Sequence, residues 1–144
     1  MVYHAPMTER DSENGRRWNE LIGPFWTTSK TARELGLSEE EIEARLADKL
    51  LLGLQTKDED VVLPSFQFMQ FEDDKWTVLP GLDQVLKPFK GVTTHAMDWT
   101  LASWLNNAER PEFEGKSIIE YLKEGNDVSL PVAMAQATAE RWVH

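Results

Sequence analysis

The chain has 144 residues, of which 41% are apolar, so it can build a core as one ordinary domain or as two small ones that share a core. It contains no cysteine, which excludes disulfides, thiolate zinc sites and thiol nucleophiles. Its 25 acidic and 15 basic residues give a formal net charge of −10, and acidic residues are in excess in both halves, so neither half attracts nucleic acid by its overall charge.

The sequence lacks the apolar segments that direct a chain into a membrane. No window approaches about 18 consecutive apolar residues, and residues 1–17 are polar where a signal peptide has an apolar run. We therefore expect a cytoplasmic protein with no membrane partner. Residues 1–17, which show no apolar period, are predicted to form a flexible arm.

Ordered structure is expected to begin at Trp18, which opens a short helical pattern that ends at Gly23-Pro24. The hydroxyls of residues 27–29 can then cap a helix that Gly36 terminates. Ser38 opens a second helix with a capping-box pattern. The buried face of that helix is predicted from residues at i, i+4 and i+8, namely Ile42, Leu46 and Leu50. This spacing is typical of a helix-turn-helix.

Strand-like runs follow the two helices. Residues 51–55 and 61–63, separated by a polar turn, predict a hairpin wing. The aromatic runs at 66–71 and 76–79 predict either a second small hairpin or one strand laid against the helices. Residues 82–89 then show the apolar spacing of an amphipathic helix.

Residues 91–94 are the expected boundary between two modules, because they lack an apolar period and precede a new helical pattern. The second module is predicted to contain three helices, at about 97–106, at 118–124 after a cap by Ser117, and from Ser129 through Ala133 and Ala137 to Trp142. We expect a mostly α fold with a small β-hairpin component, in which a winged-helix-like helix-turn-helix module (18–91) precedes a small helical domain (92–144).

The second helix of a helix-turn-helix normally reads base edges in the major groove. Here its predicted solvent face carries Glu39, Glu40 and Glu43 with Ala44 and Ala47, which places carboxylates where phosphates would lie. Like charges a few ångströms apart repel by about 1 kcal/mol even at a high effective dielectric constant. Five basic residues could still contact a DNA backbone, although solvated surface charge is the simpler interpretation of each: Lys30, Arg33, Arg45, Lys49 and Lys57.

Catalytic chemistry has no candidate residues in this sequence. The histidines at positions 4, 95 and 144 are too scattered for metal ligation. No phosphate-binding glycine loop, nucleophile elbow or carboxylate pair in an apolar setting is present. We therefore expect no enzyme, no metal and no cofactor.

The second module has more tryptophan than a core of about fifty residues needs, which suggests that one or more of Trp99, Trp104 and Trp142 lies at a surface. Core packing is the common fate of such residues, and only a contiguous exposed patch would favour the alternative.

Three segments of the C-terminal half carry a family resemblance. Residues 104–107 (Trp-Leu-Asn-Asn) precede 113–117 (Phe-Glu-Gly-Lys-Ser), and 119–122 (Ile-Glu-Tyr-Leu) precede Gly125. This half resembles the Xre/MbcA/ParS-type toxin-binding domain. The N-terminal half, at residues 23–26, 64–68 and 79–82, looks like the helix-turn-helix portion of actinobacterial proteins that carry this domain.

The resemblance implies an antitoxin that binds and blocks a RES-type toxin, an NAD-consuming enzyme, and whose helix-turn-helix represses the operon. Ile118 replaces a proline usual in the family, and the second helix is acidic where relatives tend to be basic. We expect a non-enzymatic regulator, in the form of a homo-oligomer, that occludes a partner protein. The expected partner-binding residues are Trp99, Trp104, Phe113, Ile118, Tyr121 and Trp142. The alternative is a transcription regulator that binds DNA.

Overall fold

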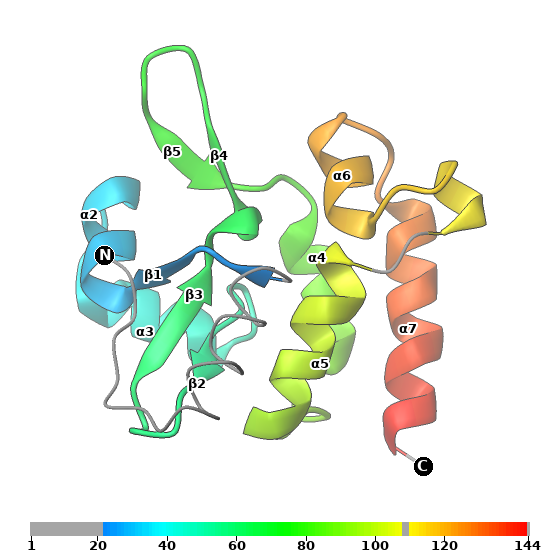
Figure 1. Cartoon of the computed structure of the whole chain (residues 1–144), viewed down its shortest axis with the longest axis horizontal. Coiled ribbons are helices and arrows are strands. Elements are labelled where there is room, and N and C mark those ends of the chain that lie inside the picture. Colours follow the sequence, from blue (N-terminus) through cyan, green and yellow to red (C-terminus); the bar gives the residue numbers. More distant parts are fainter. Residues whose placement is uncertain (1–21, 108–109, 144) are drawn as a thin grey trace, which may run out of the picture.

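The structure, a computed structural model, describes residues 22–107 and 110–143 (Figure 1). Helices predominate, and the strands form two small antiparallel sheets. The prediction of a mostly α fold with a small β component is confirmed. The predicted arm, and the predicted first helix before Ile22, lie outside the described residues.

The first sheet and two helices form one end of the molecule. The elements are β1 (Phe25–Thr27), α2 (Thr28–Leu35), α3 (Glu39–Ala47), β2 (Leu54–Gln55) and β3 (Val61–Pro64). The sheet has the order β1-β3-β2, and all its pairs are antiparallel. The hairpin predicted from residues 51–63 is therefore present as β2–β3. Strand β1, which pairs Trp26 with Leu63, was not predicted.

The predicted helix caps are in place. The hydroxyl of Thr27 accepts a hydrogen bond from the Lys30 amide (3.0 Å), and Gly36 ends α2 in the left-handed conformation. The Ser38 hydroxyl accepts one from the Glu41 amide (3.1 Å) at the start of α3.

The buried face of α3 differs from the prediction at its last position. Ile42 is fully buried, but α3 ends at Ala47, and Lys49 turns the chain in the left-handed conformation (φ 57°). The helical period therefore breaks before Leu50, which is 41% exposed, and Leu51 takes the buried place at 1%. The prediction for Leu50 is wrong because it extended the helix one turn too far.

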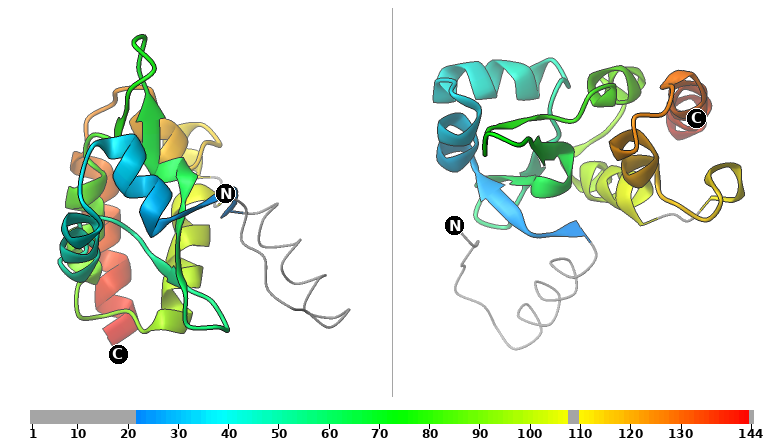
Figure 2. Two further views of the ribbon diagram at one scale, coloured as in Figure 1. Left: turned by 90° about the vertical axis from the view of Figure 1, so that its left-hand side faces the viewer. Right: turned by 90° about the horizontal axis from the view of Figure 1, so that it is seen from above.

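The second sheet shows that, of the two alternatives expected for residues 66–79, the hairpin is the one that forms. It follows a 3-10 turn, η1 (Ser65–Gln67), and consists of β4 (Phe68–Gln70) and β5 (Trp76–Val78). Its connecting turn projects away from the rest of the molecule in two perpendicular views (Figures 1 and 2). In η1 the buried amide of Gln67 accepts from the Leu52 amide (2.9 Å) and donates to the carbonyls of Leu52 (2.8 Å) and Pro64 (3.0 Å).

The remaining elements are helical: α4 (Leu82–Leu86), η2 (Lys87–Phe89), α5 (His95–Asn106), η3 (Pro111–Phe113), α6 (Ile118–Lys123) and α7 (Ser129–Val143). Helix α5 begins two residues earlier than predicted because the Thr94 hydroxyl caps it. A reciprocal capping box between Ser117 and Glu120 starts α6. On α7, Ala133 and Ala137 lie on the exposed face, while Ala135 and Ala139 are buried.

Two apolar clusters hold these elements together. The smaller one gathers around Trp26, whose ring stacks on Phe68 at a centroid distance of 4.5 Å. The larger one joins residues on both sides of the expected boundary at 91–94, including Leu54 and Leu105. The segment expected to separate two modules is thus a turn that links halves of a shared core.

Candidate functional site

The exposed face of α3 is acidic. Glu39, Glu40 and Glu43 are exposed on one face with Ala44 and Ala47, as the helical spacing predicted, and Glu41 is exposed as well. Three of these carboxylates lie in the first turn, where the partial positive charge of the helix N-terminus favours them. The surface that a helix-turn-helix would present to DNA therefore repels phosphate.

The turn between β2 and β3 has the same charge. Residues 57–60 are exposed and carry one lysine against three carboxylates. The turn is ordered by hydrogen bonds from the Thr56 amide to the Asp60 carbonyl (2.8 Å) and from the Glu59 amide to the Thr56 carbonyl (3.0 Å). The tip of this hairpin thus adds negative charge to that of α3.

All five predicted DNA-binding residues are exposed or partly buried, and four of them lie where they could contact an external group. Lys30 is partly buried, with its ammonium 5.2 Å from the centroid of the Trp26 ring. Arg33 has a 71% exposed side chain within 3.7 Å of the Glu34 carboxylate. Arg45 is partly buried on α3, and Lys57 is exposed in the β2–β3 turn. Each could contact an external group, but the positive charge is dispersed.

Lys49 is the exception and a correction to the predicted set. Its ammonium donates to Asp98 Oδ1 (2.6 Å) and to Thr93 Oγ1 (2.9 Å), and Thr93 Oγ1 donates to the same Asp98 oxygen (2.6 Å). The side chains of Lys49 and Asp98 are only 14% and 11% exposed. Lys49 therefore holds α5 against the turn after α3 and does not face a phosphate backbone.

The six predicted partner-binding residues do not form an exposed face. Phe113 is 2% exposed and Ile118 fully buried, so these two predictions are wrong: both side chains fill the core. Because the helical pattern alone does not tell which face of a short helix is covered, the sequence could not separate this outcome from exposure. The remaining four, all partly buried, pack against the larger core cluster: Trp99, Trp104, Tyr121 and Trp142.

The partly buried aromatic residues make internal contacts. The Trp99 indole donates to the Gln55 carbonyl (3.1 Å), which links α5 to β2. Trp104 and Trp142 contact Phe89, with ring centroids 5.5 and 5.2 Å from it. These rings join α5 and α7 to η2, which is a packing role.

Arg110 covers part of Trp104. Its guanidinium lies 4.7 Å from the centroid of the indole and donates to the Trp104 carbonyl (3.1 Å). Burial lowers the pKa of Arg110, and nearby Glu112 opposes that shift. The ring of Trp104, one of the six predicted partner-binding residues, is thus partly covered by this arginine.

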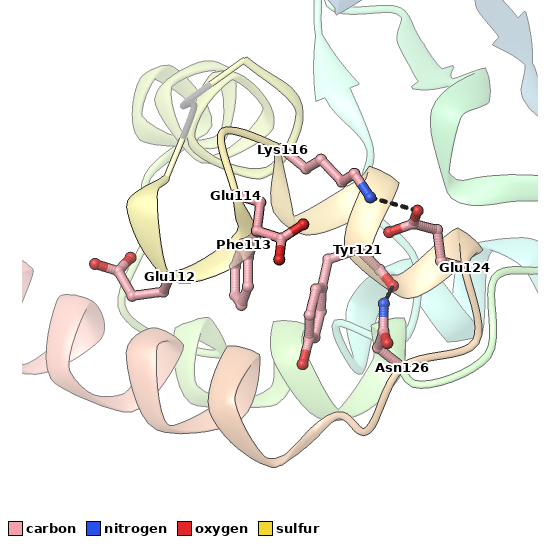
Figure 3. A pocket seen from close by; sticks show the side chains of 7 residues that line it. All are labelled: Glu112, Phe113, Glu114, Lys116, Tyr121, Glu124 and Asn126. Atoms are coloured by element: carbon pink, nitrogen blue, oxygen red, sulfur yellow. Dashed lines mark hydrogen bonds and ion pairs between the residues drawn. The ribbon is translucent and has the colours of Figure 1, made fainter.

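A polar pocket of about 300 Å³ lies between η3 and α6 (Figure 3). Its walls include the stacked rings of Phe113 and Tyr121, whose centroids are 4.1 Å apart. At its rim Lys116 donates to Glu124 (2.6 Å), and this hydrogen bond raises the pKa of Lys116. The other lining residues are Glu112, Glu114 and Asn126. Among the predicted residues, the structure brings only Phe113 and Tyr121 to this pocket.

Large apolar side chains are exposed elsewhere. Within the described ranges they are Leu50, Val61, Phe71, Leu130 and Val143. A shallow depression of about 460 Å³ lies beside Val143, between α7 and η2, and includes Pro88, Val92 and Ala139. Phe71, 51% exposed, is an aromatic side chain that the sequence placed in a hairpin but not in a site. Its position directly before the acidic run 72–74 was the signal that could have marked it.

The described residues offer neither a metal site nor a membrane-spanning helix. Residues 22–107 and 110–143 hold no group of three or more His, Asp or Glu side chains arranged to bind a metal ion. Over the same ranges no helix is both long and apolar enough to cross a membrane.

Comparisons with known proteins yield a likeness of fold alone. No protein-family model matches the chain, and neither does any curated protein sequence. The NMR structure of Rv2175c is similar, with a TM-score of 0.51 over 83% of this chain and 79% of that one, at 14% sequence identity. An identity this low supports a shared arrangement of elements without extending to binding or activity.

Proposed function

We propose that this chain is a non-enzymatic regulatory protein that binds and occludes a partner protein, in the manner of an antitoxin. In this proposal the N-terminal elements form a scaffold like that of many DNA-binding proteins, but their exposed surface is unsuited to DNA. We expect the partner protein to have a basic surface. The family resemblance of the sequence suggests that it is a RES-type toxin.

A winged-helix-like arrangement of the N-terminal elements is part of the proposal. The order β1-β3-β2, with β1 before the two helices and the β2–β3 hairpin after them, supports it. So does the tight connection between α2 and α3, in which the Leu37 amide donates to the Ala32 carbonyl (2.9 Å). In this arrangement α3 is the recognition helix and the β2–β3 turn is the wing tip.

The acidic exposed face of α3 is the observation that carries the proposal. Both parts that would approach DNA, α3 and the turn at 57–60, present more carboxylates than cations. Bringing them to a phosphate backbone would add repulsion without the release of counterions that drives such binding. The same charges favour rapid association with a basic protein surface.

Co-expression with the protein encoded by the adjacent gene tests the proposal. A stable complex on affinity purification, together with relief of any toxicity of that protein, is the expected result. A control chain with Glu39→Lys, Glu40→Lys and Glu43→Lys changes only exposed residues of α3 and reverses their charge. This chain should bind the partner more weakly. If no complex forms and toxicity is unchanged, the proposal fails. Light scattering of the isolated chain tests the predicted homo-oligomer in the same preparation.

The second candidate is a transcription regulator that binds DNA. The surface cations Arg33 and Lys57 are what favour it, because both are exposed and could contact phosphates. A mobility-shift assay on the upstream DNA at 50 and 200 mM salt tests it: binding that weakens by about 10-fold or more with salt would support this function, and absence of binding at 50 mM would exclude it.

A further inference from the structure

The geometry points to the tip of the β4–β5 hairpin, residues 71–75, as a docking element that inserts Phe71 into an apolar pocket rimmed by Lys and Arg side chains on a partner protein. This inference rests on the proposed function and adds a second contact surface to the acidic face of α3. The tip lies at the far end of the projecting hairpin in Figures 1 and 2.

The tip is held in one conformation by its own hydrogen bonds. The Phe71 amide donates to the Lys75 carbonyl (2.9 Å), and the Asp74 amide donates to the Phe71 carbonyl (2.9 Å). The Gln70 side chain donates to the Asp74 carbonyl (3.2 Å), and Asp74 adopts the left-handed conformation that closes the turn (φ 62°). A turn that is already ordered loses little conformational entropy when it binds.

The base of the hairpin is anchored in the smaller core cluster. Phe68 stacks on Trp26, and Trp76 meets the same ring edge-on at a centroid distance of 5.0 Å. The Leu79 amide donates to the Gln67 carbonyl (2.8 Å), which ties the end of β5 to the buried turn η1. The tip is therefore carried on a rigid support and not on a loose loop.

Phe71 belongs to neither of the apolar core clusters formed by the described residues. It is 51% exposed, while Phe68 on the same hairpin is 2% exposed. Aromatic side chains are enriched in the buried centre of protein interfaces, and a preorganised one can act as an energetic anchor there. A partner that binds the Phe71 ring therefore needs an apolar pocket.

The negative charge of the tip indicates that the rim of the partner's pocket is basic. The carboxylates of Glu72, Asp73 and Asp74 against the ammonium of Lys75 give the tip a formal charge of 3 − 1 = 2 negative units. All four side chains are exposed, so a partner must neutralise them or leave them in water at the interface edge. A partner pocket with an apolar centre would accept the Phe71 ring, and Lys and Arg side chains around it would neutralise the carboxylates.

The test uses the full chain and the protein encoded by the adjacent gene, with affinity measured by biolayer interferometry. Phe71→Ser should weaken binding by at least about 20-fold, as expected for the loss of an aromatic anchor. Glu72→Gln with Asp74→Asn should slow association by about 3-fold or more at low salt, and less at high salt. Leu130→Ser, on the exposed face of α7, is the matched control and should change affinity less than 2-fold. The melting temperature of each variant confirms folding, since none of these side chains is buried.

The outcomes separate the two proposals. If the unaltered chain does not bind the partner at all, the proposed function and this inference both fall. If it binds and Phe71→Ser binds equally well, the proposed function stands and the hairpin is excluded. If Phe71→Ser and Leu130→Ser weaken binding alike, the contact is not specific to the tip, and the inference is likewise overturned.

Discussion

Lys49 and Asp98, 49 positions apart in the sequence, form a mostly buried ion pair with 2.6 Å between Nζ and Oδ1. The pair joins the turn after α3 to the first turn of α5. Thr93 bonds to both side chains, so each charge has a second partner. The expected boundary between two modules is in this way crossed by a charged contact as well as by the apolar core.

Replacing Lys49 by Met should destabilise the fold by about 3 kcal/mol, because it leaves the Asp98 carboxylate buried without its cation. Urea unfolding followed by tryptophan fluorescence measures the change. Lys90→Met serves as the control, since the Lys90–Asp48 pair (3.3 Å) is exposed on both sides, and such pairs contribute less than about 1 kcal/mol.

The double variant Lys49→Met with Asp98→Leu isolates the cause. If the buried charge is what destabilises the single variant, removing both charges should restore at least half of the lost stability. A double variant less stable than the single one would show that packing, and not the unpaired carboxylate, dominates.

Gln67 offers a test of the hydrogen bonds that support the hairpin. Gln67→Leu retains the volume but leaves the amide and carbonyl of Leu52 without their partner, at a cost of about 3 kcal/mol. The midpoint of urea unfolding should fall while the slope stays the same. The exposed Gln84→Ala should leave the free energy of unfolding within about 0.5 kcal/mol of the original. An unchanged midpoint for Gln67→Leu would contradict the structural role of this amide.

The stability of the start of α7 should decrease at acid pH, because Asp127 loses its charge there. The hydroxyl and the amide of Ser129 hold the pKa of this carboxyl below its ordinary value of 3.8. The folded-state pKa is the lower one, so the stabilisation is present above about pH 3.8 and is lost as pH falls through the folded-state pKa. Carboxyl-carbon NMR titration should give a midpoint below 3.8.

Ser129→Ala is the matched variant for this carboxyl. It removes the hydroxyl and keeps the amide, so the pKa of Asp127 should rise part of the way toward its ordinary value. The original chain and Asp127→Ala should differ in stability at pH 6 and converge near pH 2. An Asp127 midpoint above 3.8 in the original chain would contradict the hydrogen bond.

Reversing the charge of α3 should create DNA affinity. Glu39→Lys, Glu40→Lys and Glu43→Lys change exposed residues only, and the binding of a non-specific duplex at 50 mM salt should tighten by about 10-fold or more. The control places three lysines at Glu72, Asp83 and Glu112, which are exposed away from α3. Fluorescence anisotropy at two salt concentrations measures both. Equal affinities would show that total charge, and not the α3 face, excludes DNA.

Local signals predicted most of the secondary structure. A hydroxyl cap needs only residues within one turn, so Ser38 and Ser117 marked the starts of α3 and α6. Gly36 marked the end of α2 for the same reason. The two hairpins followed from apolar runs on either side of polar turns.

What the sequence could not predict depends on contacts between distant residues. Strand β1 exists because three residues after Pro24 pair with β3, which lies more than 30 positions further along. Lys49 was interpreted as a surface cation because its ion-pair partner, Asp98, lies far along the chain in another helix. Phe113 and Ile118 were predicted to lie on an accessible face because the sequence does not show which distant elements cover them. The charge of α3 was predictable, since helical spacing placed its carboxylates correctly.

Whether this chain binds a protein or DNA is decided by isothermal titration calorimetry of the purified chain against the purified protein of the adjacent gene at physiological salt. We expect a saturable complex with a Kd of about 1 μM or tighter, and no binding of the upstream DNA in the same buffer. Absence of heat with the protein, together with saturable binding of that DNA, would contradict this expectation and identify the chain as a DNA reader.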